Sequence, residues 1–444
     1  MAALKVEITS TETVKPSSPT PNHLRTHKLT ILDQTAPPAY VPLCLFFPRR
    51  RDSSYDQDSF AESLKDSLSN TLNVYYPLAG RYRDDFSIDC NDAGVDLVRA
   101  RVGCHLSDAL GQETVDEDRL LPLLPCRPQG RRVDSDGELV LLAVQVSFFE
   151  CGGLSVGVCC WHGVSDACTL ACFLRTWSGK TQDGNDESSG VVRDCTDVFP
   201  PRDLSAASES VEGFRAAVAT PGTRIKRFVF GRDKIAALRR DIEAANSQQR
   251  PSRVQAVSAV IWAAAIKIAR VKNEGRGQCH IAAMTTNLRS RMEPALPEQA
   301  MGNLVQIPVF AERPVDNDDD YNALAAKLRE SVKMVNDENM RKAMGSGFSN
   351  VLRRFAEEYA EGNLLAISSW CRFPFYEVDF GIGKPIWMCF FTMCYNLVVL
   401  LDAEDGVGIE AWVTLSEEDM SKFEKDVGVL KYATCSKSIV GVHH

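Results

Sequence analysis

The sequence predicts an α/β protein built from two units of similar size. Its 444 residues exceed what one hydrophobic core usually organises, and the 44% that are hydrophobic suffice for two cores. Runs typical of β-strands alternate with helical runs in both halves. Between residues 178 and 213 the composition becomes polar and acidic and the hydrophobic period disappears, so we expect a crossover linker there. The predicted domains are therefore residues 1–177 and 214–444.

The first predicted domain contains one clearly marked helix. From Phe60 to Leu72 an apolar residue recurs at every fourth position, which gives the helix one apolar face. Ser59 and Glu62 fit a capping box, so the helix is expected to begin at Ser59. The apolar run 41–47 predicts a strand before it.

Glycines and apolar runs mark the elements that follow. Two β-rich runs, 139–149 and 154–161, are joined by a glycine pair, which is typical of a hairpin. The second half begins with a predicted strand at 224–230, and helices are expected at 233–246 and 254–271.

His162 directly follows the second run of this hairpin. Apolar residues alternate along the run in the same parity as His162, so we expect its side chain on the inward face of the strand. A glycine follows, and an apolar helix is predicted from 167 to 177. His162 and Asp166 are therefore predicted at a strand-to-helix corner.

This corner has two chemical interpretations. In the first, His162 is a general base that removes a proton from an acceptor hydroxyl or amine, and Asp166 orients the corner. In the second, residues 163–167 form an incomplete G-x-S-x-G elbow and Ser165 is the nucleophile of an esterase. The second is disfavoured because its last glycine is alanine and, downstream, only His280 and a terminal histidine pair remain.

A second acidic residue lies in the glycine-rich segment DFGIG, residues 379–383. Glycines at alternate positions, Gly381 and Gly383, indicate a tight bend or a close approach of the backbone. We interpret the segment as a conformational hinge in preference to a reactive site, because an acid beside such a bend often binds backbone amides.

The composition excludes several classes of partner. With 50 basic and 59 acidic side chains the formal charge is −9, which argues against a nucleic-acid or membrane-surface binder. No apolar leader or unbroken membrane-length apolar stretch is present, so we expect a cytosolic protein. We also expect a monomer. Cys168 and Cys172 share a helix face near His162, but the spacings of metal sites are missing, so no metal is predicted.

Several motifs in order resemble the BAHD acyltransferases, plant enzymes that move an acyl group from coenzyme A to an alcohol or amine. The two hallmarks of that family are HxxxD, here HGVSD at 162–166, and DFGWG, here DFGIG at 379–383. Further similar segments are residues 76–81, 88–91, 258–262, 287–291, 302–303 and 408–413. Because they span almost the whole chain in the family's order, the chain is identified as a member of that family.

The resemblance implies a fold and a mechanism. Two similar domains, each a mixed sheet flanked by helices as in chloramphenicol acetyltransferase, would be joined by the linker. His162 would lie in a channel at their interface, with acyl-CoA and the acceptor alcohol reaching it from opposite ends. It would act as the base while the acceptor attacks the thioester directly. Acyl-CoA would thus be a co-substrate, with no tightly bound cofactor and no acyl-enzyme.

The resemblance also implies supporting roles for several residues. Asp166 would be paired with Arg289 and would hold the corner in shape. Asp379 is counted with the active residues of the family, but its role would be mainly architectural, supported by Gly381 and Gly383.

Contacts with CoA are implied at three positions. Ser252 and Arg253 fall where the family binds the nucleotide phosphates, and Lys384 is a further candidate. Residues 32–34 and 383–385 resemble a branch of the family that uses acetyl-CoA on alkaloids, terpenoids or simple alcohols. Ile382 departs from the family's usual Trp, which leaves open a non-catalytic protein that kept the fold.

Overall fold

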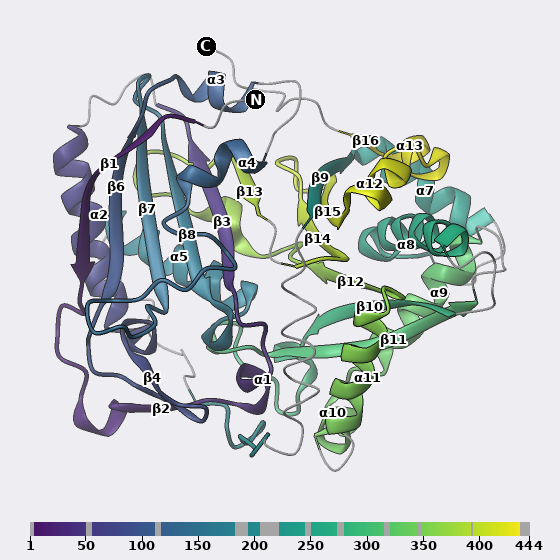
Figure 1. Cartoon of the computed structure of the whole chain (residues 1–444), viewed down its shortest axis with the longest axis horizontal. Helices are drawn as coiled ribbons and strands as arrows, with labels where there is room; N and C mark the ends of the chain where they lie inside the picture. The colour runs from purple at the N-terminus through teal and green to yellow at the C-terminus, as the bar shows by residue number, and fades with distance from the viewer. Residues whose placement is uncertain are drawn as a thin grey trace.

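The computed structural model describes residues 4–49, 56–111, 117–182, 194–204, 222–244, 250–272, 279–314, 320–344, 348–391 and 394–435. Figure 1 shows two units side by side, each built on a β-sheet with helices. We call them the first and the second domain. The predicted α/β class with two sheet-based domains is confirmed. Most of the predicted linker, residues 183–193 and 205–213, lies outside the described residues.

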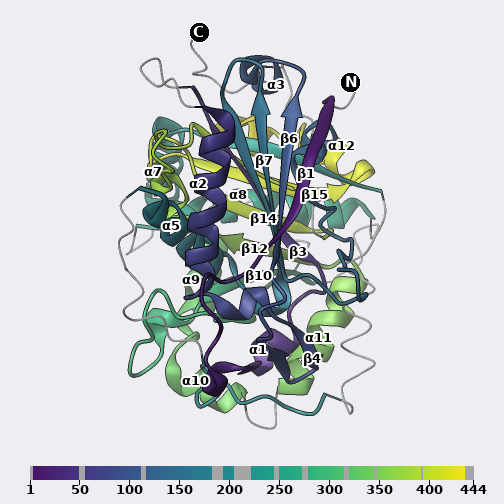
Figure 2. The ribbon, with the colours of Figure 1, turned by 90° about the vertical axis from the view of Figure 1, so that its left-hand side faces the viewer.

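The first domain is built on a six-stranded mixed sheet. Its strands, in spatial order, are β1 (Val6–Val14), β6 (Val95–Val102), β7 (Leu142–Phe149), β8 (Leu154–Trp161), β3 (Tyr40–Phe47) and β13 (Trp387–Phe390). The pair β6 and β7 is parallel, and the other neighbours are antiparallel. Helices α2 (Gln57–Leu72) and α5 (Ala167–Gln182) pack together on one side of the sheet (Figure 2).

Short elements complete the first domain. They are a three-stranded sheet of β2 (Thr26–Lys28), β5 (Ser87–Asp89) and β4 (Arg81–Asp84), and the helices α1 (Ile31–Gln34), α3 (Leu106–Leu110) and α4 (Glu117–Leu120). Of these, α1 contacts strand β11 (Val305–Pro314) of the second domain.

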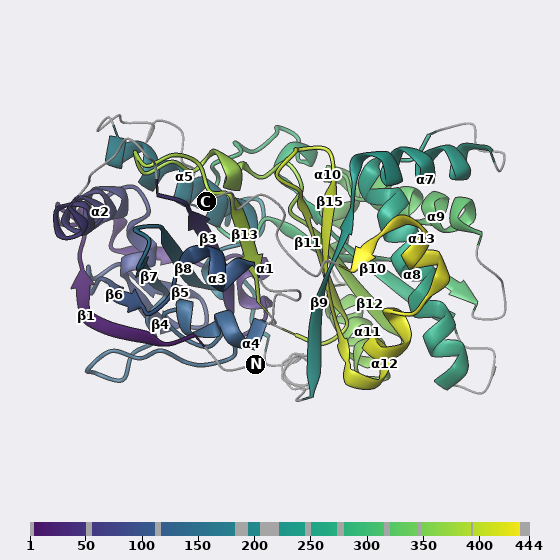
Figure 3. The ribbon, with the colours of Figure 1, turned by 90° about the horizontal axis from the view of Figure 1, so that it is seen from above.

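The second domain is built on a seven-stranded mixed sheet. Its strands, in spatial order, are β11 (Val305–Pro314), β10 (Cys279–Asn287), β12 (Leu364–Ser369), β14 (Leu397–Asp402), β15 (Ile409–Ser416), β9 (Thr223–Phe230) and β16 (Thr434–Cys435). Its helices are α7 (Arg232–Ala244), α8 (Arg253–Lys272), α9 (Tyr321–Lys333), α10 (Asp337–Ala343), α11 (Phe348–Ala360), α12 (Glu417–Phe423) and α13 (Val427–Tyr432). Figure 3 shows α7, α8 and α9 on the side of this sheet that faces away from the first domain.

The domain boundary predicted from the sequence needs one correction. The segment 214–444 does not keep to one sheet, because β13 pairs with β3 at the edge of the first sheet (Figure 1). All four residues of β13 are buried, and the Trp387 ring stacks on Phe46 at 5.4 Å between ring centroids. β13 covers an edge strand that would otherwise expose unpaired backbone groups. The first domain is therefore completed by a piece of the C-terminal half.

The start of α2 also differs from the prediction. The capping residue is Asp56, whose carboxylate accepts a hydrogen bond from the Ser59 amide at 2.8 Å, so the helix begins at Gln57. Aspartate is as good a capping residue as serine, and it lies three residues earlier. The predicted apolar face is correct, since Leu64, Leu68 and Leu72 are fully buried.

The predicted hairpin of β7 and β8 is present. Gly152 in its turn has φ of 81°, a conformation that glycine adopts without strain. All eight residues of β8 are buried, so the strand has no single inward face. The alternation along β8 therefore does not determine the direction of the His162 side chain. The turn that follows the strand determines it.

Helix α8 is the longest helix of the second domain's core. By length and composition it could cross a membrane, but 67% of its most apolar window is buried inside the molecule. Its buried side chains, such as Trp262, pack against the sheet and the neighbouring helices. It is therefore a core helix of the domain.

Candidate active site

His162 and Asp166 lie at the corner between β8 and α5. The chain leaves β8, makes a short 3-10 turn that starts at His162, and then enters α5. A side chain at position 163 would crowd this turn, because a Cβ atom there would come within 2.1 Å of the Tyr82 hydroxyl and the Tyr82 side chain would have to move. Asp166 accepts a hydrogen bond from the Thr169 amide at 2.7 Å, which caps the first turn of α5. The local chain geometry therefore fixes both functional side chains.

Asp166 forms a buried ion pair with Arg289 of the second domain, as predicted. Arg289 Nη1 donates to Asp166 Oδ2 at 2.7 Å, and Nη2 donates to Oδ1 at 3.1 Å. Each side chain is only 3% exposed. Burial alone would lower the pKa of Arg289, but the Asp166 carboxylate raises it above its ordinary value, so the guanidinium is held as a cation. The pair joins the His162 corner to the segment that follows β10.

His162 is oriented by Asn303. The imidazole Nδ1 lies 2.9 Å from Asn303 Oδ1. The amide nitrogen Nδ2 of Asn303 donates to Asp33 Oδ1 at 3.0 Å and to the carbonyl of His162, so its oxygen must be the atom that faces the ring. An oxygen there accepts a proton from Nδ1. The neutral imidazole therefore carries its proton on Nδ1 and has an unprotonated Nε2.

Asp33 fixes Asn303 from the other side. Its Oδ1 also accepts from the backbone amide of Asn303 at 2.8 Å. Its Oδ2 accepts from the amide and the hydroxyl of Thr30, at 2.9 and 2.7 Å, at the start of α1. Asp33 and Asn303 are both buried. A series of hydrogen bonds through Asp33 and Asn303 thus connects the capped start of α1 with the imidazole of His162.

The surroundings keep His162 neutral. Burial lowers its pKa below the ordinary value of 6.5, and the bond to Asn303 and the charges of Asp166 and Asp33 offset this only in part. A neutral imidazole at neutral pH is the form that can accept a proton. The geometry and the charge state together make His162 a candidate general base.

His162 borders a cavity of about 180 Å³ between the two domains. The second sheet supplies one wall, because side chains two residues apart share a face of a strand. Thr285 and Asn287 of β10, Ser368 of β12, and Leu397 and Val399 of β14 all line it. The first domain supplies the opposite side with α1 and the His162 corner. Residues from both halves of the chain are therefore needed to form the site.

Ser165 does not line this cavity. Its side chain is 1% exposed, and its hydroxyl donates to the carbonyl of Asp166 at 3.1 Å. The imidazole nearest in sequence, His162, is bonded to Asn303 instead. The elbow-like interpretation of residues 163–167 therefore lacks an exposed nucleophile.

Asp379 forms hydrogen bonds with backbone amides of its own turn. Its Oδ1 accepts hydrogen bonds from the amides of Gly381 and Gly383, at 2.8 and 2.9 Å. The two glycines have φ of 88° and 100°, which a residue with a side chain rarely adopts. Asp379 does not line the cavity. The observed bonds are those expected of an acid that shapes a bend.

Comparisons with known proteins identify the family. The sequence model of the Transferase family matches residues 4–430 of this chain. The chain belongs to this family of BAHD acyltransferases. It is similar to limonoid 1-O-acetyltransferase of Citrus sinensis, with 38% identity over 98% of this chain and 100% of that protein. It is also similar to stemmadenine O-acetyltransferase of Catharanthus roseus, with 38% identity over 96% and 97% of the two chains.

The fold agrees with a solved member of the family. The crystal structure of vinorine synthase superposes with a TM-score of 0.83 at 35% identity, covering 98% of this chain and 100% of that one. The predicted family, fold and enzyme class are confirmed: the chain is a BAHD acyltransferase, and acyl-CoA is its co-substrate.

The departure from the BAHD pattern at Ile382 is accommodated by the first domain's core. Ile382 is 4% exposed and belongs to that core. Next to it, Phe380 packs edge-on against Trp177 of α5 at 4.8 Å and against Phe47 of β3 at 5.8 Å between ring centroids. The DFGIG segment thus anchors the C-terminal half in the first domain, immediately before β13.

The residues implied for CoA binding lie apart from the cavity. Ser252 precedes α8, and its Oγ accepts from the Gln255 amide at 3.1 Å. Arg253 Nη2 donates to Asp402 Oδ1 at 2.9 Å, and Nη1 donates to the Gly406 carbonyl at 3.1 Å. Lys384 is exposed. None of the three lines the cavity, and the guanidinium of Arg253 is already bonded to the end of β14 and to the loop that follows.

No metal centre is found in the part of the chain that the structure describes: it holds no group of three or more His, Cys, Asp and Glu side chains able to bind a metal. Cys168 and Cys172 of α5 both point at the Glu298 carbonyl, at 3.7 and 3.8 Å from Sγ. Both are buried free thiols.

Two functional residues were missed by the sequence reasoning, Asn303 and Asp33. Both stand in segments used for the family resemblance, 302–303 and 32–34. Nothing in the local pattern shows that they meet, because they are 270 residues apart. The only indication in the sequence was that each segment contains a polar residue for which no partner was predicted.

Proposed function

We propose that this enzyme transfers the acetyl group of acetyl-CoA to a hydroxyl group of a plant specialised metabolite, an alkaloid, a terpenoid or a simpler alcohol. The observation that carries this proposal is the unprotonated Nε2 of His162, held by Asn303 at a cavity that both domains form. The names of the relatives support the acetyl donor and the acceptor class, since they include acetyltransferases of limonoids and of stemmadenine.

The proposed reaction needs one base and no covalent intermediate. Nε2 of His162 takes the proton of the acceptor hydroxyl while the oxygen attacks the thioester carbonyl. The C–S bond then breaks, the acetyl group stays on the acceptor oxygen, and the proton is returned to the CoA thiolate. Asp166 and Arg289 act as positioning residues that keep the corner in place. Asp379, with Gly381 and Gly383, shapes the segment that anchors the C-terminal half.

Three features remain predictions. The first is the contact of CoA with Ser252, Arg253 and Lys384. A phosphate of CoA at Arg253 would compete with Asp402 for the guanidinium. The monomeric state and the cytosolic location are the others.

The test is release of CoA from acetyl-CoA by the purified protein with a panel of hydroxylated alkaloids and terpenoids. Formation of the acetate ester is followed by mass spectrometry. We expect stoichiometric CoA and ester with at least one acceptor, and the same activity in the Ser165→Ala variant. Absence of CoA release with every acceptor, together with labelling of Ser165 by a serine-reactive probe, would instead support an esterase.

A further inference from the structure

The described residues that line the cavity beside His162 offer no free carboxylate to a positively charged acceptor. Among the described residues that line it, Asp166 is the one acidic side chain. Its Oδ1 accepts from Thr169 and Arg289, and its Oδ2 accepts from Arg289 and from the Leu304 amide at 3.1 Å. Its charge is balanced by the Arg289 guanidinium. Asp166 therefore has no carboxylate oxygen left for a substrate.

The other polar groups of the lining are uncharged. They are hydroxyls and amides, such as those of Thr35, Thr285 and Ser368. Thr35 donates its hydroxyl proton to the Ile31 carbonyl at 2.9 Å, and Ser368 accepts from the Trp370 indole at 3.1 Å. Such groups can orient a hydroxyl or carbonyl of a substrate, but they cannot neutralise an ammonium group.

Aromatic rings form much of the remaining wall. Trp370 meets Phe390 of β13 edge to face, with 5.2 Å between ring centroids. On α11, Phe355 and Tyr359 stack at 5.8 Å. Rings of this kind pack well against a flat or polycyclic hydrocarbon skeleton. The lining therefore suits a rigid, largely apolar acceptor.

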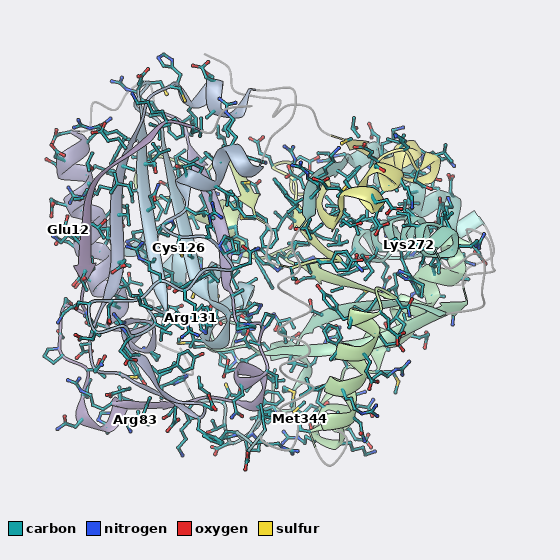
Figure 4. The ribbon with its side chains drawn as sticks, in the orientation of Figure 1. Glu12, Arg83, Cys126, Arg131, Lys272 and Met344 are labelled. Atoms are coloured by element: carbon teal, nitrogen blue, oxygen red, sulfur yellow. The ribbon has the colours of Figure 1, made fainter. Side chains whose placement is uncertain are left out.

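Two side chains are examples of charge that lies far from this cavity. Figure 4 shows Glu12 at the outer edge of the first domain and Lys272 on the far side of the second domain. Both form ion pairs there, with Lys65 and Asp419 respectively. A protonated amine that entered the cavity would lose its hydration without gaining an ionic partner, and a ring face replaces a carboxylate only in part.

We propose that the acceptor of this enzyme is an uncharged polycyclic alcohol of terpenoid type, and that an acceptor carrying an amine reacts only as its free base. The inference rests on the proposed acetyltransferase function and narrows its acceptor class.

The test compares a matched pair of acceptors: a rigid polycyclic alcohol, and its analogue in which one ring carbon distant from the hydroxyl is replaced by a tertiary amine nitrogen. The ratio of kcat/KM for amine to carbon acceptor is measured with acetyl-CoA from pH 6 to 9. We expect it to rise about tenfold per pH unit below the pKa of the amine, following the free base. The quaternary N-methyl analogue should not be acetylated.

A variant pair provides the reverse test. Thr285 lines the cavity, and its hydroxyl makes a long contact of 3.5 Å to the Ile367 carbonyl. Thr285→Asp introduces the missing carboxylate, and Thr285→Asn is its uncharged match. At pH 7 we expect the Asp variant to favour the amine acceptor by about tenfold relative to the Asn variant, because a charged hydrogen bond becomes available. If Thr285→Asp does not fold, Ser369→Asp and Ser369→Asn serve the same purpose.

The outcomes separate this inference from the function on which it rests. Acetylation of the quaternary analogue, a ratio that stays flat or falls with pH, or no difference between the Asp and Asn variants would overturn the uncharged-acceptor inference alone. Absence of acetylation with every acceptor would overturn the proposed function and this inference with it.

Discussion

The corner at 162–166 and the bend at 379–383 each have an acidic residue within three positions of a glycine, but the contacts of the two acids differ. Asp166 binds Arg289 and the Leu304 amide, more than 120 residues away, as the separations of 123 and 138 show. Asp379 accepts from amides two and four residues along its own turn. The Asp166 carboxylate therefore joins the two domains, whereas these bonds of the Asp379 carboxylate shape a single loop.

This difference predicts different results when each corner is broken. Loss of a partner at the first corner leaves a buried charge and moves the segments that hold His162. Loss of the Asp379 carboxylate removes bonds within a turn that does not line the cavity.

Arg289→Met should have the largest effect, because it leaves the Asp166 carboxylate buried without its partner. We expect the free energy of unfolding to fall by about 3–5 kcal/mol and acetyl transfer to be lost. The matched control is Arg341→Met, which breaks the exposed pair with Asp337 at 2.8 Å on α10 and should change little. Urea unfolding and kcat are measured for both. Equal stability of the two variants would show that the buried pair does not hold the corner.

Asn303→Ala should lower kcat by roughly tenfold to a hundredfold, the equivalent of a lost buried hydrogen bond. The bond from Nδ1 raises the pKa of His162, so its loss should also move the acidic limb of the pH profile to lower pH. Asn336→Ala removes the cap of α10 and is the control, with a small loss of stability and no change of the profile. An unchanged pH profile in Asn303→Ala would argue that Asn303 does not influence the pKa of the His162 imidazole.

The wild-type pH profile should have a midpoint below 6.5. Burial lowers the pKa of His162, and the base acts when unprotonated, so kcat/KM with an acceptor that does not titrate should rise with pH and level off before neutrality. The profile is measured from pH 5 to 9. A midpoint above 7 would mean that the imidazole is held as a cation.

Asp379→Ala should have the smallest effect on turnover. Two hydrogen bonds to Gly381 and Gly383 are lost, so we expect a decrease of about 1–3 kcal/mol in the free energy of unfolding and less than a tenfold decrease in kcat. Asp405→Ala is the match, since Asp405 accepts from the amides of Val407 and Gly408 at 2.9 and 2.7 Å. A folded Asp379→Ala protein without activity would contradict a role limited to the shape of this turn.

Features set by neighbouring residues could be predicted from the sequence. The helix expected at 254–271 is observed as Arg253–Lys272, because its apolar residues are continuous along the chain. The predicted pair of Asp166 and Arg289 is present, but the residues alone gave no reason to join them, and the family resemblance did.

Features that depend on distant segments could not be predicted. β13 completes the first sheet from the C-terminal half because its apolar residues fit the free edge of β3, which no local pattern shows. The contact of Asn303 with His162 spans 141 residues. The part of the site that selects the tautomer of the base was therefore visible only in the structure.

The role of His162 as the base is tested by the rate of acetyl transfer in His162→Ala and Ser165→Ala, measured side by side with acetyl-CoA and the best acceptor. We expect His162→Ala to lose about a thousandfold in kcat, as for removal of a general base, and Ser165→Ala to keep its activity. Circular dichroism and thermal unfolding verify that both variants fold. Undiminished turnover in a folded His162→Ala protein would contradict the central claim.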